Sequence, residues 1–525
     1  MEGYTATRID SQEEQLVYSC GNECLPSYLT LLTALVCLVC AFTFDTTKPL
    51  NSSNVIFIFF CVLSSFAIIA GLHEHKPIGA EVVLAIYVAS FIIRLDYVLY
   101  TDVSLDAIVR QHDVGVFGAN SVGHAGYIEW FFNHYLSFEY DPTIGQFYHP
   151  PLHHILVSLW MRFLTLFGFS FGRCVASIQY LTLFYSCCCS IVSEKIINQI
   201  GLNGIGKTCA FALISFHPSF IILAGSINND ILSLLFILLS VYATLLWWQD
   251  GTLRNIILIA LSIGCGMMTK LTAAVLAPAI LFVFIAALFR SAGDWKKLII
   301  QLTAFCLVSF PLGLWYPLWK YLQFHVPLTF VQRLSVDSPQ FVGNYSPIER
   351  MFVFNPHFFY TPFEGFISFG VDYQEYNPLV AILKNSMFGE YNFAAITPNI
   401  VFTARLLLLV NFLIIILSIW ASFFGFLRAL KSMDKVTYSF LLLYALLLLT
   451  YYFKFCIDFP HTCSMDYRYI VPTCVIGSIF IGYYLNMPKE SYKGWIYRCI
   501  SNVTPVLVGL FCILVSIVYV VIGLF

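Results

Sequence analysis

The sequence has 525 residues, of which 59% are hydrophobic and 11% charged, and its formal net charge at pH 7 is −2. A soluble domain carries roughly 25% charged residues, so a soluble fold of this size could not cover its surface with so few. The small net charge also gives no reason to expect a nucleic-acid partner. The composition therefore predicts an integral membrane protein.

Apolar segments long enough to cross a bilayer, which takes about 20 residues, recur along the whole chain. They lie near residues 26–44, 54–71, 79–99, 173–193, 205–225, 230–247, 254–270, 272–289, 298–317, 401–427, 437–453, 468–485 and 503–523. We therefore expect an all-α polytopic membrane protein with about 13 transmembrane helices. Residues 1–525 would form a single transmembrane domain with two long exterior loops, at about 100–172 and about 318–400.

Lysine and arginine residues in the short loops gather on one side of this topology, and that side is then cytoplasmic. They are Lys195, Lys207, Arg254, Arg290, Lys296, Lys297, Arg428, Lys431, Lys435, Lys489, Lys493 and Arg498. Asn344-Tyr345-Ser346, in the second exterior loop, is an acceptor sequence for an N-glycan. Most of the 17 cysteines lie in apolar runs, and only Cys456 and Cys463 share a candidate exterior loop that would allow a disulfide.

The first long loop concentrates ionisable side chains beside apolar helices, where charges are costly and indicate a site. They are Asp102, Asp106, Arg110, His112, Asp113, His124, Glu129, Asp141 and His149. A carboxylate in such a site can take the proton of an attacking hydroxyl, and Asp113 is the first candidate for this base. Glu129, among Trp130, Phe131 and Phe132, is a second candidate, because burial would raise its pKa. The alternative interpretation is an ordinary solvated loop.

The sequence HPPLHH closes this loop and places His149 and His153 four residues apart. On one helix they would share a face, as metal ligands do, and a divalent metal stays open as a cofactor. The interpretation we favour is an amphipathic helix lying on the membrane, with its histidines at the level of the headgroups.

Two cations stand at the exterior ends of apolar segments, Lys270 in GMMTKLTA and Arg468 in MDYRYIVP. Together they could hold a phosphate, and the alternative is that they extend toward lipid headgroups. Asn229 and Asp230, with Asn228, precede another span on the same side, where helix capping alone explains their residue types.

Five stretches in this order resemble the GT-C superfamily of glycosyltransferases, in particular protein O-mannosyltransferases and aminoarabinose transferases. They are RQHDVG followed by GHAGYI, QFYHPPLHH, INNDILSLLF, MMTKLTA and CSMDYRYIVP. The resemblance implies a sugar donor on a polyprenyl phosphate such as dolichyl phosphate, attack by an acceptor hydroxyl, and inversion at the anomeric carbon. Protein O-mannosyltransferases carry an Asp-Glu pair where this chain has His112-Asp113, so the acceptor stays open.

The same resemblance implies roles for individual residues. Asp113 would be the base, with His112 beside it, and Lys270 and Arg468 would hold the carrier phosphate. We expect the substrate to contact His124, His149, Asn229, Asp230 and Asp466. The sugar would be mannose or another hexose, and the location the endoplasmic reticulum membrane, with a bacterial inner membrane as the alternative. A secondary transporter of a small polar solute or a lipid-linked sugar is the competing function.

Overall fold

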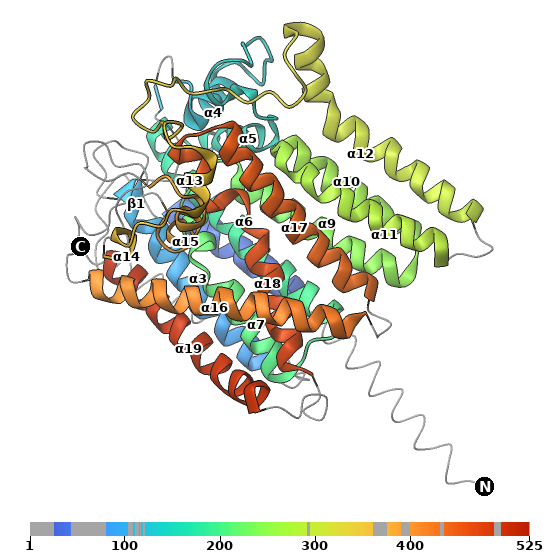
Figure 1. Cartoon of the computed structure of the whole chain (residues 1–525). Coiled ribbons are helices and arrows are strands. Elements are labelled where there is room, and N and C mark those ends of the chain that lie inside the picture. The colour runs from blue at the N-terminus through green and yellow to red at the C-terminus, as the bar shows by residue number, and fades with distance from the viewer. Residues whose placement is uncertain are drawn as a thin grey trace.

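The computed structural model describes residues 26–43, 80–102, 109–110, 115, 117–118, 121–290, 295–360, 375–389, 400–430, 435–487 and 495–523. These residues are built almost entirely from helices (Figure 1). The strands among them are the two-residue β1 (Thr101–Asp102) and β2 (Val109–Arg110), which pair in parallel. The expected all-α fold class is confirmed for this part of the chain.

Nine helices in the described ranges are long and apolar enough to cross a membrane, or ten if one bent pair is a single span. They are Pro26–Thr43, α3 (Ala80–Tyr100), α6 (Phe171–Gln199), α9 (Asp230–Asp250), η2 (Leu271–Leu276) with α11 (Ala277–Arg290), α12 (Trp295–Phe324), α16 (Val401–Ala429), α17 (Lys435–Asp458) and α19 (Trp495–Gly523). The bent pair is α7 (Gly204–Phe216) with α8 (Pro218–Ala224). Two shorter apolar helices are α10 (Leu253–Thr269) and α18 (Pro472–Leu485).

Every predicted crossing but one therefore coincides with an apolar helix or with the bent pair. The exception, near residues 54–71, lies outside the described ranges, so a count of thirteen is not confirmed.

The remaining helices lie between the spans. The first long loop holds α4 (His124–Asn133), η1 (Gly145–Tyr148) and α5 (Leu152–Thr165). The second holds α13 (Pro347–Phe352), α14 (His357–Tyr360) and α15 (Pro378–Phe388), and η5 (Thr462–Met465) and η6 (Tyr467–Tyr469) connect α17 to α18.

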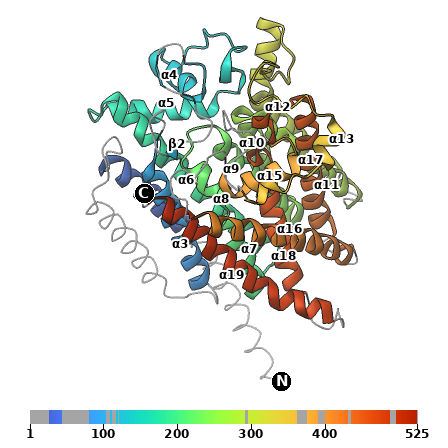
Figure 2. The ribbon, with the colours of Figure 1, turned by 60° about the vertical axis from the view of Figure 1, so that its left-hand side comes forward.

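The spans form two packed groups. In the first, α10 packs against both α9 and α12, and in the second α18 packs against α7 and α16, while α19 packs against α16, α7 and α3. Helix α6 joins the groups, because it contacts α9 as well as α7 and α3. Turning the molecule shows α4 and α5 together beyond the ends of the spans, beside the end of α12 (Figure 2). We call this end of the bundle the loop end.

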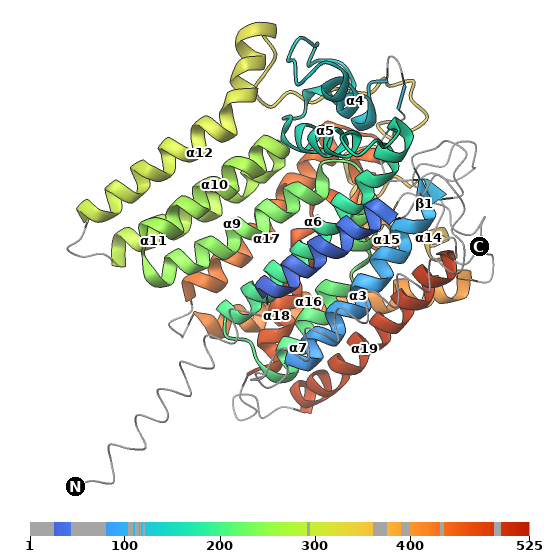
Figure 3. The ribbon, with the colours of Figure 1, turned by 180° about the vertical axis from the view of Figure 1, so that it is seen from behind.

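The helix of residues 26–43 lies beside α3, as the view from behind shows (Figure 3). The Thr33 and Tyr87 hydroxyls are hydrogen-bonded across this contact at 2.6 Å. At the loop end, the Arg173 side chain of α6 donates to Phe42 O at 2.6 Å. These contacts fix the N-terminal helix against the body of the protein.

The expected crossing near 205–225 consists of two helices that meet at a 40° bend, because Pro218 has no N–H to donate to the preceding helix. Helix α12 continues past the expected loop boundary at about 318 and ends at Phe324. The disulfide that the sequence allows between Cys456 and Cys463 is not formed, and the buried Cys456 thiol instead donates to Ser464 O at 3.4 Å.

Candidate functional site

Three segments far apart in the sequence meet at the loop end and bring together buried charges. Asp230 is the first residue of α9, Lys270 follows the last residue of α10, and Arg468 lies in η6. Asp230 Oδ1 forms an ion pair with Lys270 Nζ, and Asp230 Oδ2 lies 3.8 Å from Arg468 Nε. The structure therefore brings the two cations together at a shared carboxylate.

Asp466 is the second carboxylate of this group and is 3% exposed. Its Oδ1 accepts the backbone N–H of Arg468 at 2.9 Å, and its Oδ2 lies 3.7 Å from Arg468 Nε. Both carboxylate contacts of Arg468 Nε are longer than a hydrogen bond, which spans up to about 3.2 Å. The guanidinium is thus oriented by two carboxylates without being tightly bonded to either through Nε.

The ring of Tyr469 lies next to both cations. Lys270 Nζ lies 5.0 Å from its centroid and Arg468 Cζ lies 5.1 Å from it, and Arg468 Nη2 donates to the Tyr469 hydroxyl at 3.2 Å. An aromatic face attracts a cation within about 6 Å. This ring therefore helps to hold two like charges near each other.

The turn before α9 fixes the position of Asp230. Asn228 Oδ1 accepts the Asp230 backbone N–H at 3.1 Å, but the N-cap residue of α9 is Asn229, whose side chain makes no capping bond. Asn229 instead donates through its side chain to Thr269 O at 2.9 Å. Since Thr269 directly precedes Lys270, this bond ties the start of α9 to the end of α10 at the ion pair.

Four buried histidines lie beside the charged group. His124 Nδ1 and His154 Nε2 are 3.0 Å apart, and the His149 ring stacks on His124 at 5.3 Å. His153 Nε2 donates to Ile227 O at 2.8 Å. His124 and His149, both expected at the substrate site, are therefore brought together, and the other two were not predicted there.

Burial, helped by the charges of Lys270, Lys320 and Arg468, holds the pKa of His149 well below its usual range. Burial likewise lowers the pKa of His154, and it lowers the pKa of His153 to about 4. All three rings are therefore neutral at physiological pH, and each can donate or accept a hydrogen bond but carries no charge.

The expected position of these histidines on a membrane-surface helix is wrong. His153 and His154 are fully buried, and the exposed side chains are Leu159 and Phe163 of α5 with Leu166 and Phe167 just after it. His149 precedes the start of α5, so it does not share a helical face with His153. Among the described residues, no group of three or more His, Cys, Asp or Glu side chains is arranged to hold a metal ion.

The remaining candidates fall in the first loop. Asp113 and His112 lie outside the described residues. Gly115, which follows them, has φ of +74°, and a Cβ there would lie 3.0 Å from the Gly123 Cα, next to the start of α4. Glu129, on α4, is half-buried and accepts the Gly118 N–H at 2.7 Å, so its carboxylate braces the loop backbone.

Lys320 is a buried residue of the same region that the sequence did not single out. It lies near the end of α12, is 0% exposed, and donates to Tyr148 O at 2.9 Å. The sequence does contain a signal for Lys320. Most lysines and arginines next to the spans lie on the opposite side of the membrane, whereas Lys320, like Lys270, lies at the loop end of a span.

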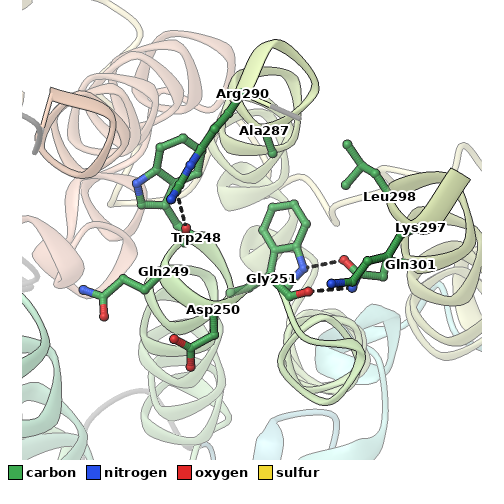
Figure 4. A pocket seen from close by; sticks show the side chains of 10 residues that line it. Trp248, Gln249, Asp250, Gly251, Ala287, Arg290, Lys297, Leu298 and Gln301 are labelled. Carbon is green, nitrogen blue, oxygen red and sulfur yellow. Dashed lines mark hydrogen bonds between the residues drawn. The ribbon is translucent and has the colours of Figure 1, made fainter. Parts of the chain in front are cut away.

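A separate pocket of about 260 Å³ opens at the opposite end of α9 (Figure 4). Its lining includes Trp248, Asp250, Arg290 and Lys297, and Arg290 Nη1 donates to Trp248 O at 3.0 Å. We call this end of the bundle the basic end. The pocket is separated from Asp230 by the whole length of α9, which is about 30 Å at 1.5 Å per residue.

Comparison with known proteins gives one family. A model described as dolichyl-phosphate-mannose-protein mannosyltransferase matches residues 149–315, under a third of the chain. That segment includes His149, Asn229, Asp230 and Lys270. No curated protein matches.

Two solved structures are similar over most of this chain. The archaeal oligosaccharyltransferase AglB from Archaeoglobus fulgidus, in complex with an inhibitory peptide and a dolichol-phosphate, is 13% identical with a TM-score of 0.49. The match covers 83% of this chain and 56% of that one, so this chain spans little more than half its length. ArnT from Cupriavidus metallidurans, bound to undecaprenyl phosphate, is 12% identical with a TM-score of 0.43, and the match covers 85% of this chain and 77% of ArnT.

The family match confirms the resemblance that the sequence motifs carry, and it rests on the segment that supplies Asp230 and Lys270 to the buried charged group. Over residues 149–315 the chain is therefore similar to the dolichyl-phosphate-mannose-protein mannosyltransferase family.

Proposed function

We propose that this protein is a membrane glycosyltransferase that moves a sugar from a polyprenyl-phosphate carrier to an acceptor hydroxyl. The observation that carries the proposal is the pair Lys270 and Arg468, whose side chains are 8% and 6% exposed and face Asp230 at the ends of apolar helices. A carrier lipid lies in the bilayer and presents its phosphate at the membrane edge. Two cations at the ends of spans suit a phosphate delivered from that direction.

The charged group suits a leaving phosphate better than a permanent salt bridge. When the sugar departs, the phosphate gains negative charge, and donors already in position stabilise that charge without reorganising. Asp230 and Asp466 hold the Arg468 guanidinium in place, with Nε 3.8 and 3.7 Å from the two carboxylates. A planar guanidinium bonds two phosphate oxygens at once, whereas the Lys270 ammonium acts as a point charge.

The reaction follows from these parts together with the first-loop base. The acceptor oxygen attacks the anomeric carbon from the face opposite the phosphate, and the carbon–oxygen bond to the phosphate breaks with inversion. The electron pair of that bond leaves with the carrier phosphate, toward Lys270 and Arg468. Asp113 takes the acceptor proton, and a positioned general base contributes about 10²–10⁴-fold in rate.

The neighbouring imidazoles suit the sugar and the acceptor. His149 adds no positive charge, so it can bond hydroxyl groups without drawing the phosphate away from Lys270 and Arg468. His124, stacked on His149, offers a second imidazole beside it. We place Asn229, Asp230 and Asp466 at the same site as residues that orient the cations.

The donor that we propose is mannose or another hexose on dolichyl phosphate, and the location is the endoplasmic reticulum membrane. The description of the matching family names dolichyl-phosphate-mannose, which makes that compound the first donor to test.

The test uses the purified chain in lipid vesicles that contain dolichyl phosphate carrying radiolabelled mannose. Transfer of label to an added acceptor, or hydrolysis to free sugar with release of dolichyl phosphate, supports the proposal. If the labelled lipid instead crosses between leaflets with its sugar bond intact, the chain is a transporter. A vesicle set carrying an Asp113→Asn variant distinguishes enzymatic release from spontaneous breakdown.

A further inference from the structure

Lys320 is a buried cation that the arrangement of Lys270 and Arg468 does not explain. Its side chain is 0% exposed, and it lies near the loop end of α12. Two other lysines have a carboxylate partner, since Lys207 pairs with Glu194 and Lys454 pairs with Asp458. Within the described ranges no carboxylate lies at ion-pair distance from Lys320.

The hydrogen bonds of Lys320 leave part of its ammonium without an acceptor. One N–H donates to Tyr148 O at 2.9 Å, and the Tyr316 and Phe330 rings lie 5.4 and 5.9 Å from Nζ. In the part of the chain that the structure describes, no second acceptor is in hydrogen-bond range of Nζ. A buried ammonium without a counter-ion is costly, so this arrangement suits an anion that binds there.

The surroundings hold Lys320 in place against the first loop. The Tyr316 hydroxyl, one turn earlier on α12, donates to Phe147 O at 2.5 Å, and it also bonds the hydroxyls of Tyr127 and Tyr140 at 3.3 and 3.2 Å. These bonds tie the end of α12 to α4 and η1. The ammonium is therefore fixed beside the carbonyl that directly precedes His149.

Lys320 is connected to the other two cations through the first loop. Its acceptor, Tyr148 O, directly precedes His149, and the His149 ring stacks on His124. His124 contacts His154, and the adjacent His153 donates to Ile227 O in the turn that leads to Asp230. Lys270 and Arg468 face two carboxylates, Asp230 and Asp466, so those four charges sum to zero. Lys320 adds a positive charge to the described part of the site that neither carboxylate neutralises.

We propose that Lys320 is a third phosphate-binding cation, whose uncompensated charge attracts the phosphate monoester left on the carrier lipid when the sugar departs. This inference rests on the proposed function and deepens it. The donor is a phosphodiester with one negative charge, and the product carrier is a monoester that approaches two. A single surplus cation therefore favours the product side of the transfer and a monophosphate carrier.

The test compares Lys320→Met with wild type in lipid nanodiscs, with polyprenyl phosphate and the uncharged polyprenol as probes. Methionine keeps a long apolar stem and removes the charge. We expect the affinity for polyprenyl phosphate to fall on the order of ten- to a hundredfold, as for loss of a hydrogen bond to a charged group, while polyprenol binding is unchanged. Lys454→Met, which removes an exposed lysine paired with Asp458, is the matched control and should bind both probes as wild type does.

The outcomes separate the two proposals. If wild type does not prefer polyprenyl phosphate over polyprenol and transfers no sugar, the proposed function fails. If wild type prefers the phosphate and Lys320→Met binds it equally well, only the role of Lys320 is overturned.

A measurement on the wild type covers the case in which Lys320→Met does not fold. In protein labelled with ¹⁵N at lysine Nζ, solid-state NMR should detect two lysine nitrogens close to the ³¹P nucleus of bound polyprenyl phosphate. In a Lys270→Arg variant only one lysine nitrogen, that of Lys320, should remain close to the phosphorus. Detection of a single lysine nitrogen in the wild type would exclude Lys320 as a phosphate ligand.

Discussion

Lys270 and Arg468 are held in different ways, and the difference predicts unequal effects of their removal. Lys270 is in direct contact with Asp230, whereas Arg468 Nε keeps both carboxylates at more than 3.5 Å. Arg468 also presents a fork to two phosphate oxygens. We expect Arg468→Ala to weaken use of the lipid-linked donor by about ten- to a hundredfold, and Lys270→Ala by less.

The measurement is donor KM and binding for each variant in the same membrane preparation. Arg468→Lys should recover only part of the loss, because an ammonium does not reproduce the fork. Unchanged donor kinetics in both alanine variants would mean that the carrier phosphate is bound elsewhere.

Asp113→Asn tests the base. The amide keeps the shape of the side chain and removes the proton acceptor, so kcat should fall by about 10²–10⁴-fold while donor binding survives. Turnover and donor binding are measured separately at matched expression. Glu129→Gln is the comparison, because its carboxylate accepts the Gly118 N–H and an amide oxygen can still do so. Near-normal turnover in Asp113→Asn with a collapse in Glu129→Gln would transfer the role to Glu129.

The site residues that could be predicted from the sequence are those that break an apolar pattern. Asp230, Lys270 and Arg468 stand out because an ionisable residue next to a membrane span is costly and needs a reason. Lys320 has the same signal, but it sits between aromatic residues in a segment that reads as a loop boundary. That Asp230 would bridge both cations could not be predicted, because it depends on how α9, α10 and η6 pack.

At the scale of elements, one hydrogen bond joins the first loop to the charged group. His153 of α5 donates to Ile227 O, in the turn that leads through Asn228 to Asp230. A movement of α5 would therefore move the turn that positions Asp230. Because burial lowers the pKa of His153 to about 4, the ring stays neutral in the folded protein and can make this bond across the physiological range.

This lowered pKa predicts a loss of stability in acid. The unfolded chain has a histidine pKa near 6.5, so below that pH the unfolded state binds a proton that the folded state resists. The contribution of His153 is fully present above about pH 6.5 and is lost as the pH falls toward 4. A difference of this size corresponds to roughly 3 kcal/mol.

His153→Gln separates titration from the hydrogen bond. Its side-chain amide can donate to Ile227 O and carries no charge at any pH, so the drop in thermal stability between pH 7 and pH 5 should be smaller than in wild type. His153→Ala also cannot titrate, but it loses the donor and should be less stable at pH 7. An identical pH dependence in wild type and His153→Gln would show that other groups control the acid response.

The elements themselves were largely predictable, because hydropathy reports length and apolarity directly. The prediction of elements from hydropathy was less accurate where a single residue bends an apolar segment or where a helix extends beyond it. Pro218 bends the segment of α7 and α8, and Lys320 belongs to a helix that was expected to end at 317. The histidines of HPPLHH were expected at the level of the headgroups, because an amphipathic pattern does not show whether lipid or protein covers the polar face of a helix. In the structure, protein covers that face, and His153 and His154 are buried.

At the scale of the whole molecule, the two ends of the bundle differ in chemistry. The loop end holds Asp230, Asp466, Lys270 and Arg468, whose side chains are at most 8% exposed and whose charges sum to zero. The basic end holds Arg290 and Lys297, which are exposed at a pocket mouth. Exposed lysine and arginine residues in short connections mark the cytoplasmic side of a membrane protein. The polyprenyl-phosphate site would then face the lumen or the cell exterior.

Position 344 and position 297 test this orientation from opposite ends of the molecule. Asn344 is exposed just before α13 in the second long loop, and Lys297 is exposed in the first turn of α12 at the basic end. With the 17 native cysteines replaced, single cysteines at these positions should react differently with a membrane-impermeant thiol reagent. We expect Asn344→Cys to be labelled from the exterior or lumenal side only, and Lys297→Cys only after the membrane is opened. Labelling of position 344 from the cytoplasm would contradict the orientation, and it would put the donor site on the side where the basic end is now expected.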